Sequence, residues 1–540
     1  MEDETTTQPN YNALFVFGDS LSDNGAIFAL TGGTIPPAQM TGVDLNGDPV
    51  DFDALGITYE GVFSNGPVYA DVAAGLLGIP SDTSTFYDDL SGSNVAVGGA
   101  TATDLSVLGG TASNTYADQI NAFQQVLSGL PGTDEEKSAF LGDAAASVFI
   151  GLNDLGALGG AATATGTIDQ SVIETGVTAI VEQLFTQSQT LAETGVGTII
   201  LNKLPGGSFF PNSNPLIDFF GPETAGLFDA VSASVNDGID ALAATLSAQG
   251  TKVEVVDFFN LAQEVQADAE TFGFLTLENA LPGSNAVNTL LIDDVPIKQI
   301  GFIDPVHFTA ELHEVFGAFQ ATTLGNTQND GTADSDLIGG SEAHETIFAM
   351  DGNDQVRSGD GDDLIFAGAG DDVIFAGAGN DIAFGGTGND LILGQDGNDV
   401  LVGGTGTDVL YAGDGNDVVA GSVGNDFVNG GAGDDLLIDG RGNDVVSAGS
   451  GDDTAIYRAA GDIGGTDGED SDFFFGGDGT DTLIILSEME ITDTDAFLES
   501  NNVQVFGFEN IITLDAAGLE SYDFGIVGLQ NEMADLFGLI

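Results

Sequence analysis

A nine-residue repeat dominates the second half of the sequence. From Gly331 to Ile456 the pattern G-G-x-G-[ND]-D-x-U-x, where U is apolar, runs through fourteen successive units, although the first units are degenerate. The sixth position is acidic in every unit, with Asp in thirteen units and Glu345 in one. A flexible linker does not keep a fixed period with an apolar residue always at the eighth position. The repeat therefore predicts stacked units that share a continuous core.

The spacing of the repeat predicts a calcium-binding coil. The six Gly- and Asp-rich positions are expected to turn, and the U-x positions to form a short strand with U pointing inward. Two units then complete one coil, so Asp354 stacks over Asp372 and Asp363 over Asp381. Strands of adjacent coils lie ~4.8 Å apart. An ion midway between two coils is therefore about 2.4 Å from ligands on each, which suits calcium and is too long for magnesium.

The predicted ligands are the carboxylates at the sixth position and the carbonyl oxygens of the turn glycines. Glycine is expected in these turns because they need backbone angles that a Cβ disfavours. The carboxylates are those of Asp354, Asp363, Asp372, Asp381, Asp390, Asp399, Asp408, Asp417, Asp426, Asp435, Asp444 and Asp453.

This pattern resembles the calcium-binding RTX repeats of bacterial exported proteins. The resemblance implies an all-β parallel β-roll, a type I secretion channel as partner, and an uncleaved secretion signal within Leu486–Ile540. The N-terminal sequence MEDETTTQPNY lacks the basic start and apolar stretch of an N-terminal signal, and no apolar run is long enough for a transmembrane segment. We therefore expect a secreted, extracellular protein whose array folds when calcium binds and is unfolded in the low-calcium cytosol.

The charge balance excludes some functions. The chain has 85 Asp and Glu against 7 Lys and Arg, a formal net charge of −78. Such a chain repels phosphate polymers, so nucleic acid is excluded as a partner. The absence of Cys excludes a disulfide scaffold and any thiolate site. Two interpretations of the acidity stay open: adaptation to a saline medium, or a consequence of export and calcium loading.

The first part of the chain has the pattern of an α/β domain. Apolar strand-like runs alternate with stretches of helical periodicity, which predicts a parallel sheet covered by helices on both faces. The expected strands are 13–17, 146–150, 198–201 and 253–256, and the expected helices are 68–77, 171–192, 224–248 and 309–322. The predicted organisation is an acidic extension (1–10), an α/β domain (11–324), a linker (325–330), the β-roll (331–485) and a C-terminal cap with the signal (486–540).

A Ser and a His stand out as candidate catalytic residues. His307 lies in a D-x-x-H turn with Asp304, whose carboxylate can reach one imidazole nitrogen and leave the other for a nucleophile. Ser20 directly follows an apolar strand, so its hydroxyl is expected at the carboxyl edge of the sheet, where such sheets bind ligands. We expect His313 to be a surface or packing residue, and Asp154 to shape a loop through hydrogen bonds.

Four blocks in fixed order resemble the GDSL (SGNH) lipase/esterase family. They are Gly18–Leu21 (GDSL), Asn94–Thr101, Gly151–Asp154 (GLND) and Asp304 with His307. The resemblance covers residues 11–324, and the segments FSNGP and LNKLPGGSFFP are similar to the lecithinase/thermolabile-haemolysin branch. One departure is Phe308, where many relatives have Pro after the His. The implied fold is a flavodoxin-like parallel sheet.

The resemblance also implies a role for each residue. Ser20 attacks an ester carbonyl, His307 transfers the proton and Asp304 orients the imidazole. The oxyanion is bound by the N–H of Ser20, the N–H of Gly99 and the side-chain amide of Asn153. No cofactor is expected for catalysis.

These observations favour an exported serine esterase or lipase that hydrolyses carboxylic esters, with lipids or phospholipids as substrates. Two alternatives stay open. One is a calcium-dependent adhesin or surface protein with an inactive hydrolase fold. The other is a carbohydrate acetyl-esterase, because fold does not decide the substrate.

Overall fold

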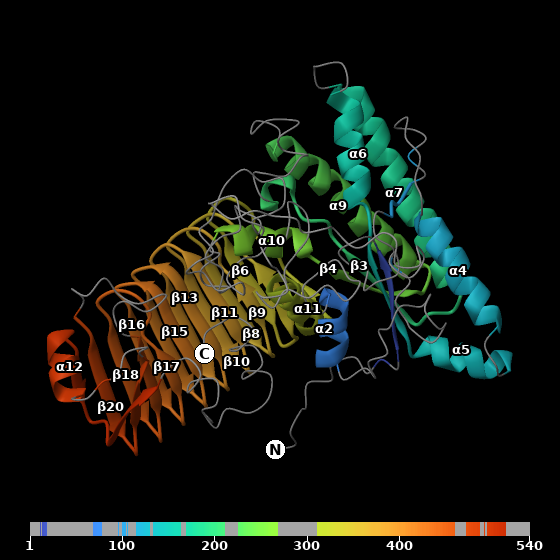
Figure 1. Ribbon diagram of the computed structural model, residues 1–540. Helices are drawn as coiled ribbons and strands as arrows, with labels where there is room; N and C mark the ends of the chain where they lie inside the picture. Colours follow the sequence, from blue (N-terminus) through green and yellow to red (C-terminus); the bar gives the residue numbers. More distant parts are fainter. Residues whose placement is uncertain are drawn as a thin grey trace, which may run out of the picture. The chain divides into compact units, whose positions relative to one another are not determined.

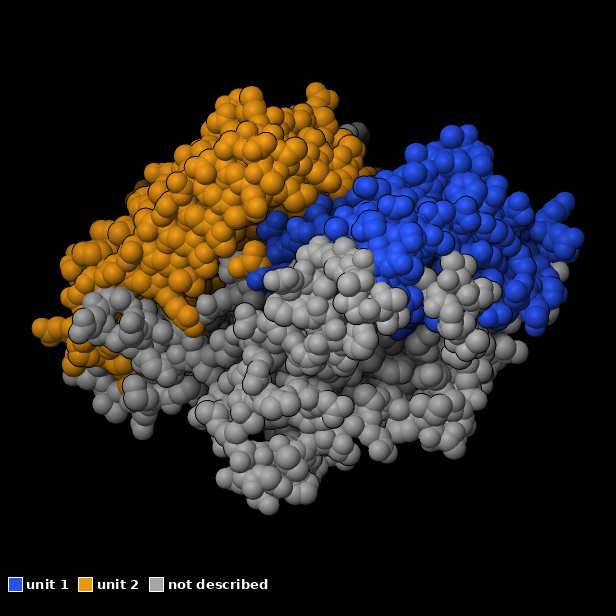
Figure 2. All heavy atoms as spheres, turned by 90° about the horizontal axis from the view of Figure 1, so that it is seen from above, with its two compact units in different colours: residues 1–266, 274–324 blue, residues 267–273, 325–540 orange. Residues whose placement is uncertain are grey.

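The computed structural model describes residues 11, 13–18, 68–77, 96, 100–103, 105, 115–129, 133–163, 169–210, 225–267, 310–458, 471–486, 491 and 494–514. The chain divides into two compact units (Figure 2). Residues 1–266 and 274–324 form the first unit, and residues 267–273 and 325–540 form the second.

The first unit is built on a parallel four-stranded sheet. Its strands are β1 (Leu14–Gly18), β2 (Ala145–Phe149), β3 (Thr198–Asn202) and β4 (Lys252–Val256), hydrogen-bonded in the order β1-β2-β3-β4. The first three strands are buried along their whole length. Continuous burial fits the unbroken apolar runs of the sequence, and the predicted parallel α/β fold is confirmed.

Helices occupy the connections between these strands, and two more follow β4 (Figure 1). They are α2 (Tyr69–Leu76), α4 (Tyr116–Gly129), α5 (Asp134–Gly142), α6 (Leu152–Thr163), α7 (Gln170–Ala192), the short 3₁₀ helix η2 (Gly207–Phe209), α9 (Ala225–Ala248), α10 (Phe258–Ala267) and α11 (Ala310–Thr323).

Side-chain contacts place helices on both faces of the sheet. On β1, the ring of Phe15 packs against Phe123 of α4, with their centroids 4.7 Å apart. On β2, Ser147 contacts Tyr69 of α2 and Gln320 of α11. Ser147 pairs with the residue after Phe15, so the side chains of Phe15 and Ser147 point to opposite faces. Helix α4 therefore covers one face, and α2 and α11 cover the other.

A buried polar network lies on the face that α2 and α11 cover. The Asn202 side-chain amide donates to Ser147 Oγ at 2.9 Å, and Gln320 Nε2 donates to Asn202 Oδ1 at 2.7 Å and to Ser147 Oγ at 3.1 Å. The Tyr69 hydroxyl lies 3.5 Å from the same Ser147 oxygen. Buried polar groups of this kind fix one arrangement of the packed elements, here β2, β3, α2 and α11.

The second unit is a two-sheet parallel roll (Figure 1). One sheet contains the odd-numbered strands β5 (Thr327–Gln328), β7 (Glu345–Phe348), β9 (Leu364–Phe366), β11 (Ile382–Thr387), β13 (Val400–Gly406), β15 (Val418–Gly424), β17 (Leu436–Ile438), β19 (Thr454–Arg458), β21 (Thr482–Leu486) and β23 (Asn510–Leu514). The other contains β6 (Leu337–Ser341), β8 (Gln355–Asp360), β10 (Val373–Ala378), β12 (Leu391–Asp396), β14 (Val409–Asp414), β16 (Phe427–Ala432), β18 (Val445–Ser450), β20 (Phe473–Asp478) and β22 (Gln504–Phe506). Helix α12 (Thr494–Ser500) lies between β21 and β22 in the chain.

The strand register confirms the predicted half-coil. Val373 pairs with Leu391, which pairs in turn with Val409, so each strand pairs with the strand 18 residues further along the chain. The residues at the eighth repeat position, such as Ile374 and Leu401, are fully buried in one core between the two sheets. Two nine-residue units therefore form each coil.

The outer faces of the two sheets differ. On the odd-strand sheet the outward rings of Phe348, Phe366 and Phe384 stack at centroid distances of 4.9 and 5.0 Å, and all three are at most 3% exposed. On the even-strand sheet Tyr411 is 42% exposed and Phe475 is 41% exposed. The sequence pattern assigned an apolar residue only to the eighth position, whereas the seventh and ninth positions are apolar in most units as well.

The roll is longer than the recognisable repeat. Strand β5 begins at Thr327, and β22 and β23 pair with β20 and β21 beyond residue 485. Between β18 and β20 the register step is 28 residues instead of 18, as shown by the pair Val445 and Phe473. Ten additional residues therefore enter one coil, and the unit that contains Asp481, out of phase in the sequence, stacks in register on Asp453.

The turn glycines have the backbone conformation that the sequence predicted. Gly388 has a φ of 136°, and a Cβ built on it would lie 1.7 Å from the carbonyl oxygen of Gly370 in the preceding coil. Gly339, in contrast, has no atom within 4 Å of such a Cβ and no positive φ. Replacement of the two glycines should therefore have very different effects.

We predict that Gly388→Ala destabilises the roll by at least about 2 kcal/mol, because strained backbone angles alone cost about 1–3 kcal/mol and the methyl group also meets main-chain atoms. The matched control Gly339→Ala should change stability by less than about 0.5 kcal/mol. Urea unfolding in saturating calcium, followed by hydrogen exchange of peptides from 345–458, measures both. Equal midpoints for the two variants would contradict the prediction.

Candidate active site and calcium-binding turns

Asn153 lies at the carboxyl edge of the first unit's sheet. It is the second residue of α6, which begins directly after β2, and its side-chain amide donates to the carbonyl oxygen of Ala100 at 2.9 Å. Ala100 follows Gly99 in the chain, so the structure brings the GLND block against the 94–101 block. Ser20, Gly99, Asp304 and His307 lie outside the described residues.

Asp154 holds the loop that follows the second block. Its buried carboxylate accepts hydrogen bonds from the N–H of Ala102 at 2.6 Å, the N–H of Thr103 at 2.9 Å and the Thr103 hydroxyl at 2.7 Å. Burial raises the pKa of Asp154 to about 6, and the hydrogen bonds from Thr103 and Ala102 oppose that rise. The prediction that Asp154 shapes a loop through hydrogen bonds is confirmed.

Gln119 is a buried residue near this edge that sequence reasoning missed. Its side-chain amide donates to the carbonyl oxygen of Gly18 at 2.7 Å and accepts from the Gly18 N–H at 3.0 Å. Gly18 is the last residue of β1 and lies two residues before Ser20. The sequence pattern did not predict a helix here, and the one available signal was a polar residue four positions before Phe123, on the apolar face of α4.

His313 has a packing role, as predicted. It is fully buried on α11, and its Nδ1 accepts a hydrogen bond from the N–H of Tyr69 at 3.1 Å. Tyr69 is the first residue of α2, so the imidazole satisfies one of the N–H groups that the first turn of a helix leaves unbonded.

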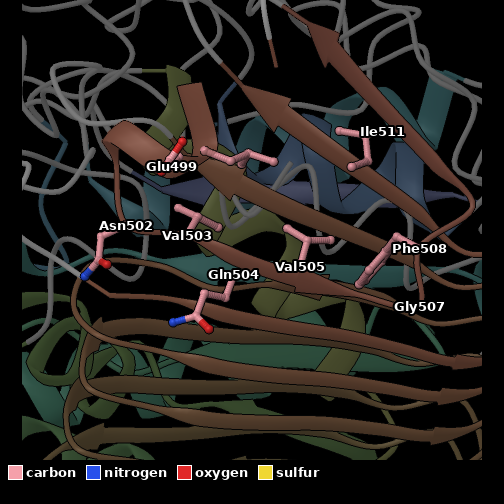
Figure 3. Close-up of a pocket in the computed structure, with 9 residues that line it drawn as sticks. Glu499, Asn502, Val503, Gln504, Val505, Gly507, Phe508 and Ile511 are labelled. Atoms are coloured by element: carbon pink, nitrogen blue, oxygen red, sulfur yellow. The ribbon is translucent and has the colours of Figure 1, made fainter. Parts of the chain in front are cut away.

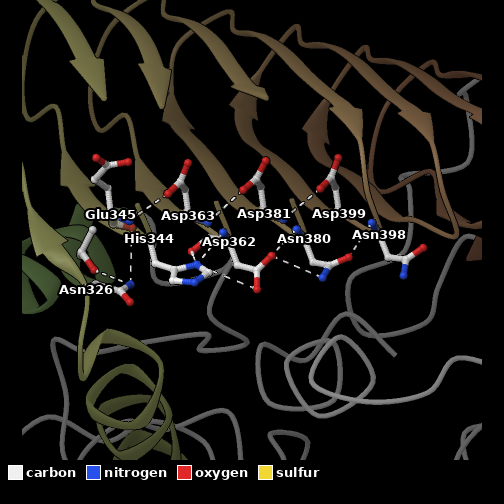
Figure 4. Close-up of polar contacts among 10 residues, drawn as sticks. Asn326, His344, Glu345, Asp362, Asp363, Asn380, Asp381, Asn398 and Asp399 are labelled. Atoms are coloured by element: carbon white, nitrogen blue, oxygen red, sulfur yellow. Dashed lines mark hydrogen bonds and ion pairs between the residues drawn. The ribbon is translucent and has the colours of Figure 1, made fainter. Parts of the chain in front are cut away.

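In the second unit, the sixth-position carboxylates form a ladder along the roll (Figure 4). The N–H of Asp372 donates to Oδ1 of Asp390 at 2.8 Å, and the N–H of Asp390 donates to Oδ1 of Asp408 at 2.8 Å. The same bond recurs on both sides of the roll, for example from Asp381 to Asp399 at 2.9 Å. The predicted stacking of these residues is confirmed, and one carboxylate oxygen of each is occupied by the main chain.

The second carboxylate oxygen is the one available to a cation. In most of these residues Oδ2 is buried and has no hydrogen-bond partner, a costly arrangement unless a cation compensates it. This holds for Asp354, Asp363, Asp372, Asp381, Asp390, Asp399, Asp417, Asp426, Asp435, Asp453 and Asp481.

A main-chain carbonyl lies near these oxygens. Oδ2 of Asp390 and the carbonyl oxygen of Gly403, one coil further along, both lie within 2.6 Å of the point at which a Cβ of Gly385 would stand, so the two oxygens are neighbours. Oxygen ligands are those that calcium prefers. The described residues contain no cluster of three His, Asp or Glu side chains, so main-chain carbonyls are the natural additional ligands here.

The carboxylates of the ladder have strongly raised pKa values. Burial is the main cause, hydrogen bonds from the preceding coil oppose it, and neighbouring Asp charges add to it. The pKa reaches about 8 for Asp381, Asp390 and Asp435, and about 7 for Asp399 and Asp417. The folded array therefore holds its negative charge poorly when no cation is bound.

A second ladder runs through the fifth repeat position in the opposite direction. The N–H of Asn398 donates to Oδ1 of Asn380 at 2.9 Å, and the N–H of Asn380 donates to Oδ1 of Asp362 at 2.7 Å (Figure 4). In the first coils the acceptor is His344, whose Nδ1 accepts from the N–H of Asp362 at 2.7 Å. The repeat pattern places Asn or Asp at this position, but it did not predict that these side chains accept main-chain hydrogen bonds from the next coil.

Two further carboxylates extend the sixth-position ladder beyond the predicted set. Asp472 accepts from the N–H of Asp444 at 3.0 Å, and Asp481 accepts from the N–H of Asp453 at 3.1 Å. Asp481 in turn donates from its N–H to Oε2 of Glu509 at 2.9 Å. Asp472 was missed because the ten inserted residues shift it out of the nine-residue phase.

Residues of α12, β22 and β23 enclose an open cavity of about 490 Å³ (Figure 3). Leu498, Val503 and Phe508 contribute apolar lining, and Glu499 contributes the one charged side chain among the lining residues.

Comparisons with known proteins agree with both units. Residues 14–318 match the family of GDSL-like lipases/acylhydrolases, and this match spans more than half of the chain. RTX calcium-binding nonapeptide repeats match at residues 339–374, 357–392, 393–428, 420–455 and 466–484. The chain therefore belongs to the GDSL-like lipase/acylhydrolase family and is a carboxylic ester hydrolase with calcium-binding repeats.

One relative is a GDSL esterase/lipase of Arabidopsis thaliana. It is 24% identical over 322 residues, which cover 56% of this chain and 86% of the relative. Among the helices in the described ranges, none is both long and apolar enough to cross a membrane.

The raised pKa values predict that protons can substitute for calcium. A carboxyl group whose folded pKa is raised stabilises the fold below its unfolded pKa near 3.8, and this contribution is lost as pH rises through the folded value. In chelator, the roll should therefore be more protected from hydrogen exchange at pH 5 than at pH 8. In millimolar calcium the protection should be high at both pH values, after correction for intrinsic exchange. Equal protection at pH 5 and pH 8 in chelator would contradict this.

Proposed function

We propose that the protein is an exported serine esterase or lipase that uses a Ser20–His307–Asp304 triad. The observation that carries this proposal is the carboxyl edge of the sheet in the first unit. There Asn153, in the helix that follows β2, donates its amide to the carbonyl oxygen of Ala100, and β1 ends two residues before Ser20. In a parallel sheet the carboxyl ends of neighbouring strands meet at one edge, which is where such folds bind substrates.

In the proposed reaction, His307 accepts the proton of the Ser20 hydroxyl as the oxygen attacks the ester carbonyl carbon. Asp304 keeps the imidazole in the required tautomer and stabilises its charged form. The N–H of Ser20, the N–H of Gly99 and the Asn153 amide stabilise the oxyanion. The imidazolium then gives its proton to the leaving alcohol, and water hydrolyses the acyl-enzyme by the same steps.

Lipids are the proposed substrates. The family match to lipases/acylhydrolases and the name of the plant relative support this proposal. A carbohydrate acetyl-esterase would use the same groups, so a panel of short esters, triglyceride, lecithin and acetylated sugars separates the two. A surface protein with an inactive hydrolase fold would cleave none of them.

The repeats bind calcium, and we propose that the sixth-position carboxylates do so through Oδ2 together with turn carbonyls. The partnerless Oδ2 of Asp390 and the adjacent carbonyl of Gly403 support this assignment. We also propose type I export to the extracellular medium, with the signal within 486–540, because RTX repeats are typical of secreted proteins. The proposed hydrolase domain (11–324) is compatible with a division of the chain after Leu324, whereas the proposed linker (325–330) contains strand β5 of the roll.

The triad predicts the behaviour of two variants. Ser20→Ala should abolish hydrolysis of p-nitrophenyl butyrate, and Asn153→Ala should lower kcat about 10²–10³-fold through the loss of one oxyanion donor. The control is Asn121→Ala, because Asn121 is exposed on α4 and should not affect the rate. Full activity of Ser20→Ala would remove this residue from the mechanism.

The calcium assignment predicts a difference between two Asp→Asn variants. Asp390→Asn keeps the oxygen that accepts from Asp372 but removes the charge, so the roll should need a several-fold higher calcium concentration to fold. Asp396→Asn, at an exposed position in the same coil, should leave the calcium midpoint unchanged. Calcium titration followed by circular dichroism measures both, and coincident midpoints would reject Asp390 as a ligand.

A further inference from the structure

The side chain of Gln119 satisfies both main-chain groups of one residue at the end of β1. Its amide nitrogen donates to the Gly18 carbonyl and its amide oxygen accepts from the Gly18 N–H, at 2.7 and 3.0 Å. In an extended strand, the N–H and C=O of one residue point to the same side. β1 is the terminal strand of the described sheet, so the Gln119 amide takes the position that a further strand would occupy next to Gly18.

The same helix also holds the second oxyanion segment. The first residue of α4, Tyr116, donates its N–H to the carbonyl oxygen of Thr101 at 2.9 Å, and Thr101 forms a parallel bridge with Thr115. Thr101 lies two residues after Gly99. The first turn of α4 therefore contacts one residue just before Ser20 in the chain and another just after Gly99.

Further hydrogen bonds fix the main chain on either side of Thr101. Asn153 is bonded to Ala100, and Asp154 is bonded to Ala102 and Thr103. On the Gly18 side, among the side-chain hydrogen bonds of the described residues, those of Gln119 are the two that reach the end of β1. The Gln119 carboxamide thus fixes the peptide groups of the last residue of β1.

The geometry points to Gln119 as a positioning residue for the oxyanion hole. Its two hydrogen bonds fix the Gly18 peptide groups, from which the chain continues to Ser20. The same turn of α4 holds Thr101, two residues after Gly99. This inference rests on the proposed serine esterase function. Oxyanion donors act at 2.7–3.1 Å from the developing charge, and a displacement of about 1 Å can cost about 10²-fold in rate, so loss of the two Gln119 hydrogen bonds should lower kcat.

The test compares Gln119→Met with Gln124→Met in the full chain. Met has nearly the same length as Gln but makes neither hydrogen bond to Gly18, and Gln124 is exposed on the same helix. With p-nitrophenyl butyrate, Gln119→Met should lower kcat about 10–100-fold and leave KM within about twofold of wild type. Gln124→Met should match wild type in both constants.

A second measurement separates positioning from folding. A p-nitrophenyl alkylphosphonate reacts as Ser20 Oγ forms a bond to phosphorus, p-nitrophenolate leaves and His307 takes the proton. The rate of this labelling, followed by mass spectrometry, should fall in parallel with kcat for Gln119→Met, while the labelled fraction at completion equals that of wild type. A lower final fraction with an unchanged rate would indicate loss of folded protein only and would overturn the inference.

Gln119→Glu gives a signature that does not depend on Gln119→Met folding. As a carboxylate, Glu accepts from the Gly18 N–H but faces the Gly18 carbonyl with a second acceptor, whereas as a carboxylic acid it can donate to that carbonyl. The ratio of its kcat to that of wild type should therefore rise as pH falls from 8 to 5. A pH-independent ratio would overturn the inference. If wild type is not labelled at Ser20, the proposed function fails first; if wild type and all variants are labelled at equal rates, only the role of Gln119 fails.

Discussion

The roll depends on one hydrogen bond, from the main-chain N–H of a sixth-position Asp to the carboxylate of the Asp one coil further on. The bond from Asp372 to Asp390 is one example, at 2.8 Å. It sets the 18-residue register and occupies Oδ1. Oδ2 is thereby left in a buried space beside main-chain carbonyls. The structure thus couples coil stacking to cation binding, because the same carboxylate takes part in both.

In the first unit, side chains from helices fix the main chain near the carboxyl edge of the sheet. The segments expected to carry the catalytic groups leave the ends of β1 and β2, where regular main-chain bonding stops. Polar side chains bind the main chain near this edge: buried Gln119 at Gly18, buried Asp154 at Ala102 and half-buried Asn153 at Ala100. Each of these side chains comes from a helix, so α4 and α6 hold the main chain at Gly18 and at residues 100–103.

The sequence was most informative where a pattern is periodic. A period of nine predicted the half-coil, the buried Ile374 and the stacking of Asp354 on Asp372, because each follows from repetition alone. Asp472 was not predicted because ten inserted residues break the nine-residue period, although the strand register of the folded roll is kept. Gln119 escaped because a single polar residue in an amphipathic helix has no local signature of its partner, which lies 101 residues away in the chain. Asn153 was found through family resemblance, and its contact with Ala100 came from the structure.

The 28-residue step between Asp444 and Asp472 has a consequence for how such arrays change. Both hydrogen-bonded ladders continue across it: the N–H of Asp444 donates to Asp472, and the N–H of Ser471 donates to Asn443 at 2.9 Å. Extra chain can thus be inserted between two strands while the stacked strands keep their pairing. The connection between Arg458 and Ser471 is therefore a natural point for lengthening the protein by evolution, and an engineer could graft a foreign peptide there without redesigning the coils on either side.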